Sequence, residues 1–130
     1  MIVADTNLIA SLLIQGPCTE AAQRLAAEEP DWRVPRLWRY ELLNVLATNM
    51  KARLVTFAEA KSVFEAATSI FVTRERDPGF QTVLRLVERH AISGYDATFV
   101  ALAQELGAPF YTGDKELLRK FPETTFRFGS

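Results

Sequence analysis

The sequence of 130 residues has few of the side chains on which several common kinds of site depend. It has one cysteine, Cys18, so the chain cannot form an internal disulfide, and a reducing compartment is its expected location. Its single histidine, His90, argues against a catalytic triad built on histidine and against a zinc site with imidazole ligands. The carboxylates are then the groups to examine for chemistry.

The chain also lacks an excess of charge of either sign and a long hydrophobic run. Fifteen Lys and Arg residues against sixteen Asp and Glu residues give a net charge of -1. This balance argues against a protein that coats nucleic acid non-specifically, but not against an enzyme that contacts a few phosphates. The apolar stretch from Leu8 to Ile14 is too short to span a bilayer, and no Lys or Arg precedes it as in a signal peptide. We expect a cytoplasmic protein without membrane contact.

The length and the alternation of apolar patterns predict one α/β domain spanning residues 1–130. Short apolar segments predict strands at residues 1–4, 32–34, 70–72, 109–112 and 125–128. Amphipathic patterns and capping residues predict helices at residues 7–14, 20–28, 36–51, 57–68, 80–89, 94–106 and 115–120. This order predicts a three-layer α/β/α sandwich around a mainly parallel central sheet.

Four acidic residues occupy positions that such a fold brings together: Asp5, Glu41, Asp96 and Asp114. Asp5 and Asp114 each follow a predicted strand, and the ligand crevice of a parallel sheet lies beyond the carboxyl ends of its strands. Glu41 and Asp96 share a predicted helix face with apolar residues, where an acid is rarely buried without a partner.

Each acid taken alone also has a purely structural explanation. Asp5 and Asp114 are suited to cap the helix that follows them. Glu41 would be satisfied by a buried ion pair with Arg36 or Arg39. Four clustered carboxylates repel one another, however, and are stable only with a bound cation or raised pKa values. A set of oxygen ligands favours Mg²⁺ or Mn²⁺ over Zn²⁺.

The acids lie in segments whose order is that of a known family. The segments are residues 2–7 (IVADTN), 40–46 (YELLNVL), 95–97 (YDA) with 101–103 (ALA), and 107–114 (GAPFYTGD). Over essentially its whole length the chain resembles PIN-domain ribonucleases, and more narrowly the VapC-type toxins of toxin–antitoxin pairs. The resemblance implies a PIN-like fold and a Mg²⁺- or Mn²⁺-dependent endoribonuclease. It also implies a homodimer that a small antitoxin protein holds inactive.

The resemblance suggests a role for each site residue. Asp5 and Asp96 would be the main direct metal ligands, and Asp114 and Glu41 would complete the site directly or through water. A metal there would make a bound water more acidic for in-line attack on a phosphodiester. Three polar residues would orient the carboxylates or hold the scissile phosphate, with backbone capping as the alternative for the first two: Thr6, Asn7 and Thr112.

Basic residues around the crevice are the candidate RNA contacts. Arg36 and Arg39 precede Glu41 on its helix, and Lys115 and Arg119 follow Asp114. A solvated basic surface is the alternative for each one singly.

Large apolar side chains are interpreted as structural. Trp32 and Trp38 are expected in the core or an interface. Tyr40, Leu43 and Ala47 are expected on the side of their helix away from Glu41, packed against the next helix or against a second chain.

Two other functional classes stay open. Receiver domains and aspartyl phosphatases also place acids at strand ends. Receivers usually need two adjacent acids after the first strand, where this chain has only Asp5, and the phosphatases need Asp-x-Asp, where position 7 is Asn. A catalytically silent RNA- or protein-binding module on the same fold is the third possibility, and the four intact acids argue against it.

Overall fold

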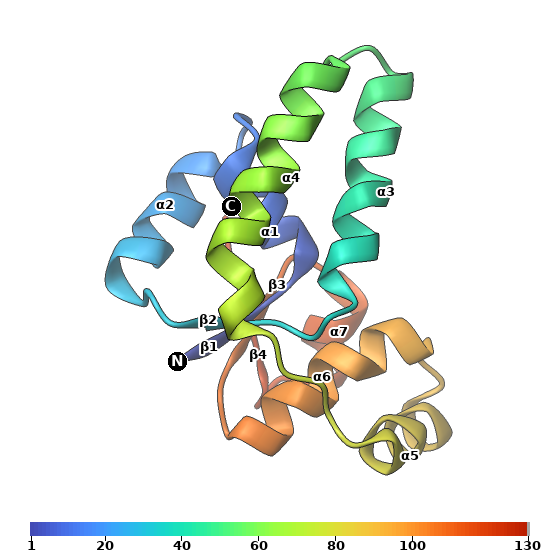
Figure 1. Ribbon diagram of the computed structural model, residues 1–130. Coiled ribbons are helices and arrows are strands. Elements are labelled where there is room, and N and C mark those ends of the chain that lie inside the picture. The colour runs from blue at the N-terminus through green and yellow to red at the C-terminus, as the bar shows by residue number, and fades with distance from the viewer. Residues whose placement is uncertain (130) are drawn as a thin grey trace.

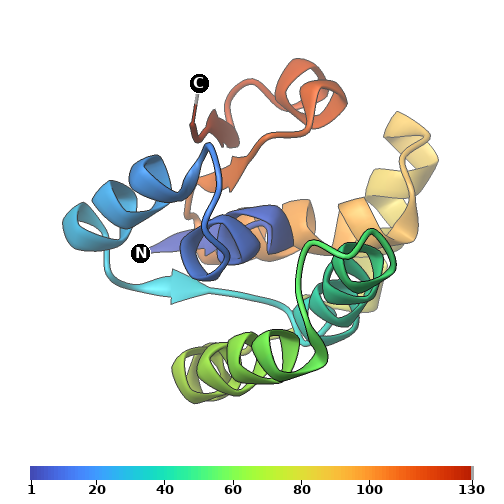
Figure 2. The ribbon, with the colours of Figure 1, turned by 90° about the horizontal axis from the view of Figure 1, so that it is seen from above.

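A computed structural model describes residues 1–129 and has a four-stranded parallel sheet at its centre. The strands are β1 (Ile2–Ala4), β2 (Trp32–Arg33), β3 (Phe110–Thr112) and β4 (Thr125–Arg127). Their order is β2-β1-β3-β4, so the first strand lies inside the sheet, and Figure 2 shows β2 and β4 on opposite sides of it. Val3 pairs with Phe110 in the register of β1 and β3, which brings residues from the two ends of the chain together.

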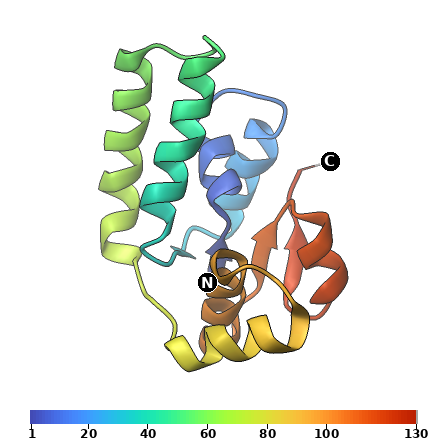
Figure 3. The same ribbon diagram turned by 90° about the vertical axis from the view of Figure 1, so that its right-hand side faces the viewer.

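Helices surround the sheet, with a short 3-10 turn, η1 (Val72–Arg74), after the fourth. The helices are α1 (Thr6–Leu13), α2 (Thr19–Glu28), α3 (Trp38–Lys51), α4 (Phe57–Phe71), α5 (Phe80–His90), α6 (Gly94–Leu106) and α7 (Lys115–Lys120). Figures 1 and 3 show α3 and α4 side by side as a hairpin whose tip reaches beyond the other helices. The predicted capping box of Thr56 and Glu59 at α4 and the N-cap Ser93 at α6 are both present.

The two faces of the sheet carry separate hydrophobic cores. Successive side chains of a strand point to opposite faces, and β1 follows this rule. Ile2 and Ala4 belong to the core that packs under α1 to α4, whereas Val3 belongs to the core formed mainly by α5, α6 and β3. The predicted three-layer α/β/α architecture is therefore confirmed.

The strand predicted at residues 70–72 is wrong. Helix α4 continues to Phe71, and Val72 begins the 3-10 turn. Phe71 is fully buried and packs on Trp32 and Trp38, with ring centroids 6.3 and 5.7 Å away. Three consecutive apolar residues fit the buried end of a helix as well as a strand, and periodicity cannot separate the two over so short a run. The burial of both tryptophans agrees with the sequence prediction.

Because β1 and β3 are neighbouring parallel strands, their carboxyl ends lie at the same edge of the sheet. Asp5 leaves β1 there and α1 begins at the next residue, while Thr112 ends β3 beside it. Helix α3 packs on α1, and α6 packs on β1 and β3. This edge is therefore walled by helices from distant parts of the chain. Over residues 1–129 no helix is long and apolar enough to cross a bilayer.

Candidate active site

A pocket of about 660 Å³ lies at this edge, and all four predicted acids line it. Its walls come from the starts of α1 and α6, from the first two turns of α3, and from the loop between β3 and α7. No Lys or Arg is among the lining residues that the structure describes. The lining residues besides the acids are Thr6, Asn7, Leu37, Tyr40, Asn44, Val45, Tyr95 and Gly113.

A chain of hydrogen bonds joins the ends of β1 and β3. The Thr112 hydroxyl donates to Oδ2 of Asp5 at 2.5 Å and accepts from the backbone N–H of Asp114 at 3.0 Å. The other oxygen of Asp5 accepts from the backbone N–H of Asn7 at 3.3 Å, which caps α1. Asp114 caps α7 by accepting from the N–H of Leu117 at 3.0 Å. Asp5 and Asp114 therefore each cap a helix and also line the pocket.

Glu41 and Asp96 enter the pocket from the first turns of α3 and α6. The positive end of a helix dipole favours an anion at this position. The Thr6 hydroxyl donates to Oε1 of Glu41 at 2.7 Å, so Thr6 contacts a site carboxylate as predicted. Ser93 caps α6 by accepting from the backbone N–H of Asp96 at 3.0 Å, and Asp96 lines the pocket.

Three carboxylates of the pocket, Asp5, Glu41 and Asp96, have raised pKa values. Burial raises the pKa of Asp5 most, the charge of Asp114 raises it further, and the hydrogen bond from Thr112 opposes both. Burial also raises the pKa of Glu41, followed by the charges of Asp5 and Asp96. The pKa of Asp96 rises for the same reasons, with Asp114 and Asp5 as its charged neighbours. The pocket therefore concentrates negative charge that no lining cation balances.

This donor set fits a hard divalent cation. Every candidate ligand is a carboxylate, hydroxyl or amide oxygen, which is the chemistry that Mg²⁺ and Mn²⁺ prefer. Across residues 1–129 no three acidic, histidine or cysteine side chains converge closely enough to enclose an ion. The carboxylates thus surround the pocket without meeting at one point.

The family model of the PIN domain matches residues 2–123 of the chain. The chain belongs to the PIN-domain family. The resemblance to PIN-domain proteins seen in the sequence is confirmed. A receiver domain and an aspartyl phosphatase are therefore excluded as the family of this chain.

Relatives of this PIN domain include a curated ribonuclease. Ribonuclease VapC3 of Pyrobaculum aerophilum is 29% identical over 125 residues, which cover 93% of this chain and 95% of that protein.

Three solved structures share the fold of this PIN domain over 97% of its chain. PAE2754 from Pyrobaculum aerophilum has a TM-score of 0.73 at 23% identity and is covered over 89% of its own chain. FitAcB from Neisseria gonorrhoeae has a TM-score of 0.72 at 18% identity, with 96% of its chain covered. A toxin–antitoxin complex from Klebsiella pneumoniae has a TM-score of 0.69 at 14% identity, again with 96% covered.

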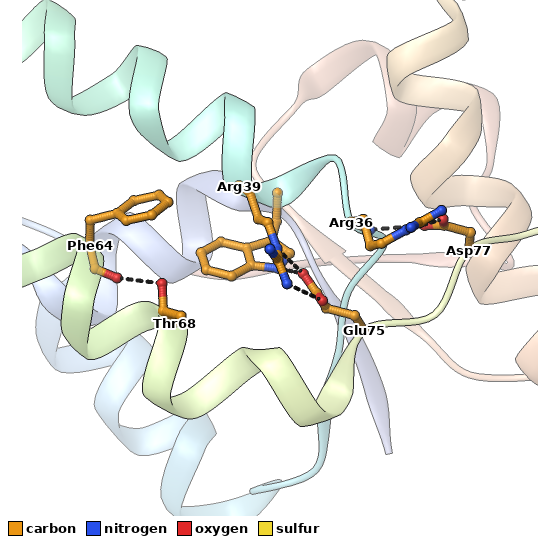
Figure 4. Close-up of polar contacts among 7 residues, drawn as sticks. Arg36, Arg39, Phe64, Thr68, Glu75 and Asp77 are labelled. Carbon is orange, nitrogen blue, oxygen red and sulfur yellow. Dashed lines mark hydrogen bonds and ion pairs between the residues drawn. The ribbon is translucent and has the colours of Figure 1, made fainter.

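The arginines expected near Glu41 form ion pairs with two other acids, Glu75 and Asp77, as Figure 4 shows. Neither of these acids lines the pocket. Arg39 donates to both oxygens of Glu75 at 2.6 Å. Arg36 donates through Nε to Asp77 at 2.7 Å. The ion pair between Glu41 and one of these arginines, the structural alternative for that acid, is not formed.

The basic residues of α7 also lie outside the pocket lining. Arg119 pairs with Glu116 at 2.9 Å on the exposed side of the helix. Lys115 is exposed and directly follows Asp114. Of the candidate RNA contacts, Lys115 is thus nearest in sequence to a pocket acid.

Three pocket residues escaped the sequence analysis: Tyr40, Asn44 and Tyr95. Tyr40 was expected away from Glu41 with Leu43, but it lines the acidic pocket, while Leu43 lines a separate groove between α3 and α4. Both residues are exposed, so this chain alone does not bury α3 on all sides. A sequence signal existed, because each tyrosine directly precedes an acid and Asn44 lies one turn after Tyr40.

Proposed function

We propose that this PIN domain is a divalent-metal-dependent endoribonuclease and the toxin of a VapBC-type toxin–antitoxin pair. The observation that carries the proposal is one pocket that gathers four carboxylates without a lining Lys or Arg. Burial and neighbouring charges raise the pKa values of three of them, Asp5, Glu41 and Asp96. The 29% identity to Ribonuclease VapC3 supports RNA as the substrate. The toxin–antitoxin complex among the structures of the same fold supports an antitoxin partner.

The four acids hold the metal in this proposal. Asp5 and Asp96 are the direct ligands, and Glu41 and Asp114 complete the site directly or through water. Mg²⁺ or Mn²⁺, when bound, lowers the pKa of a coordinated water and neutralises charge that develops on the phosphate.

Neutral polar residues in and beside the pocket position the reacting groups. The Thr112 hydroxyl fixes the orientation of the Asp5 carboxylate, and the Thr6 hydroxyl fixes that of Glu41. The exposed side chain of Asn7 lines the pocket and is placed to hold the scissile phosphate.

We assign two surfaces to macromolecular contacts. Lys115 and Arg119 continue from Asp114 along α7 and are our candidates for RNA phosphates outside the pocket. Arg39 in α3 and Arg36, which precedes α3 instead of lying in it as the sequence predicted, are the other two candidates. An apolar groove of about 450 Å³ between α3 and α4 supports a homodimer. An RNA substrate and a single free cysteine are consistent with a cytoplasmic location.

Cleavage of RNA by the purified chain tests the proposal. The chain, free of any antitoxin, is incubated with total RNA in Mg²⁺ or Mn²⁺ and then in EDTA. We expect cleavage that EDTA stops and that Asp96→Asn lowers by at least about 100-fold, since even residues that only support metal ligands contribute 10- to 100-fold. Asp31→Asn makes the same chemical change at a surface ion pair with Arg33 and should leave cleavage intact. Cleavage that survives both EDTA and Asp96→Asn would exclude the metal mechanism.

A further inference from the structure

Two exposed tyrosines lie at the rim of the acidic pocket, where neither the fold nor the proposed chemistry requires them. Tyr40 comes from the first turn of α3 and is 72% exposed. Tyr95 comes from the first turn of α6 and is 66% exposed. Both line the pocket that holds the acids, and each directly precedes one of them, Glu41 or Asp96.

The two rings are free to receive a ligand. Among residues 1–129, neither ring takes part in an aromatic pair, and neither hydroxyl has a hydrogen-bond partner. Tyr111 differs, because its ring stacks on Phe126 with centroids 5.6 Å apart. Exposed apolar surface that gathers at one place marks a site of interaction.

The charge of the pocket indicates what kind of contact the rings make. Four acids and no Lys or Arg line the described pocket, so its walls offer RNA phosphates no attractive side-chain charge. Stacking of bases on aromatic rings binds single-stranded nucleic acid without depending on charge, and it tolerates any base because every base has a π-face. It does require that the bases be unpaired.

We propose that Tyr40 and Tyr95 are base-stacking sites that hold two unpaired RNA bases on either side of the phosphate placed over the acids. The proposal rests on the proposed function and deepens it, because it assigns residues of this chain to the bases beside the cut phosphate. Asn44 lies one turn after Tyr40, lines the same pocket and presents an exposed amide to the edge of a stacked base.

Binding of RNA with and without bases tests this assignment. In an Asp96→Asn background, which keeps the RNA intact, a labelled short single-stranded RNA is compared in Mg²⁺ with an abasic oligonucleotide of the same length by fluorescence anisotropy. We expect Tyr40→Ala and Tyr95→Ala each to weaken binding of the RNA by roughly 5- to 100-fold. Tyr40→Phe and Tyr95→Phe keep the ring and should bind as the parent does. Binding of the abasic oligonucleotide should not change.

Phe80→Ala is the matched control, since Phe80 is also 72% exposed but lies on α5 outside the pocket lining. An equal loss of affinity for abasic RNA, or no loss at all, overturns the stacking proposal. A changed oligomeric state with unchanged RNA binding also overturns it, because the rings then belong to a protein interface.

The metal-dependent cleavage assay separates the two proposals. If the parent chain cleaves RNA and the alanine variants bind it normally, the stacking sites alone are wrong. A chain that neither cleaves nor binds single-stranded RNA overturns both.

Discussion

At the scale of single residues, hydroxyl groups control the geometry of the acids. Thr112 is fully buried, and its side chain both donates to Asp5 and accepts from the backbone of Asp114. Thr6 is 3% exposed and donates to Glu41. Each threonine hydroxyl therefore donates a hydrogen bond to an acid of the pocket. This bond explains why a buried polar group is tolerated at these positions.

Thr112→Val removes that hydroxyl and keeps the shape of the side chain. We expect RNA cleavage to fall by roughly 10- to 100-fold, as for other residues that orient metal ligands. The free energy of unfolding should fall by only about 1 kcal/mol. Thr112→Ser, which keeps the hydroxyl, should restore most of the activity. Equal cleavage rates for the valine and serine variants would show that the hydroxyl does not orient Asp5.

Asp96→Asn should stabilise the metal-free protein at neutral pH. The pKa of Asp96 is raised above its usual 3.8, first by burial and then by the charges of Asp114 and Asp5. The folded state therefore binds this proton more readily than the unfolded state does, and stability falls as pH rises from 3.8 through the raised pKa. Asparagine carries no charge at any of these pH values, so the variant does not lose this stability. Thermal unfolding in EDTA should give it a higher Tm at pH 7 and no such gain near pH 3.

Lys115→Ala tests a phosphate contact at the exposed start of α7. If Lys115 neutralises one RNA phosphate, the slope of log K against log salt for RNA binding should fall in magnitude by about 0.7. Binding titrations at several salt concentrations measure this slope. An unchanged slope would remove Lys115 from the RNA-binding surface.

At the scale of secondary-structure elements, the start of α3 is held by one acid from a distant segment. Glu75 follows η1, and its side chain is only 10% exposed. It accepts two hydrogen bonds from Arg39 and one, at 2.7 Å, from the indole N–H of Trp38. Both donors lie in the turn of α3 that also carries Glu41, so this contact positions a wall of the pocket.

Glu75→Gln should therefore affect both the fold and the site. We expect the free energy of unfolding to fall by about 1–3 kcal/mol, because a charge-assisted hydrogen bond to a partly buried pair is lost. Cleavage should fall as well, since the turn that carries Glu41 loses its anchor. Asp77→Asn is the comparison, as the Arg36 side chain of that pair is 72% exposed and such pairs contribute about 1 kcal/mol or less. Chemical denaturation and RNA cleavage measure the two effects.

Most elements were predictable because their signals are local. Ser93 and Asp114 mark the starts of α6 and α7, and both helices have the predicted bounds. The run from Ile70 to Val72 was misread because its conformation depends on packing against distant tryptophans, which local periodicity does not contain. Propensity gives way to tertiary packing in such a case.

The acids of the site were predictable for a related reason. Glu41 is a carboxylate on an apolar helix face, and Asp5 is one at the end of a buried strand. A charged group in apolar surroundings breaks the local pattern of the sequence, and such breaks are typical of functional positions. A tyrosine such as Tyr40 conflicts with nothing, since it is acceptable both inside and at the surface. Its residue type therefore indicates no site, and its position next to Glu41 is the one signal that the sequence carries.

At the scale of the whole molecule, we expect the pocket to couple metal binding to folding. Mg²⁺ or Mn²⁺ that binds the folded carboxylates should raise the free energy of unfolding by about 2.7 kcal/mol at a hundredfold excess over its Kd. Protons compete with the metal for carboxylates whose pKa values are raised, so the gain in Tm should be larger at pH 8 than at pH 5. Asp96→Asn should shrink the gain. Equal gains at both pH values would exclude these carboxylates as the ligands.

The position of β1 inside the sheet has a consequence for how the protein is made. Thr112, the hydrogen-bond partner of Asp5, is synthesised 107 residues after it. A nascent chain that has not yet reached β3 holds Asp5 and Glu41 without the strand that orients one of them and without Asp114. For a ribonuclease, this order of synthesis delays activity until the ribosome has passed β3 and Asp114, so the partly made chain does not cleave the message from which it is translated.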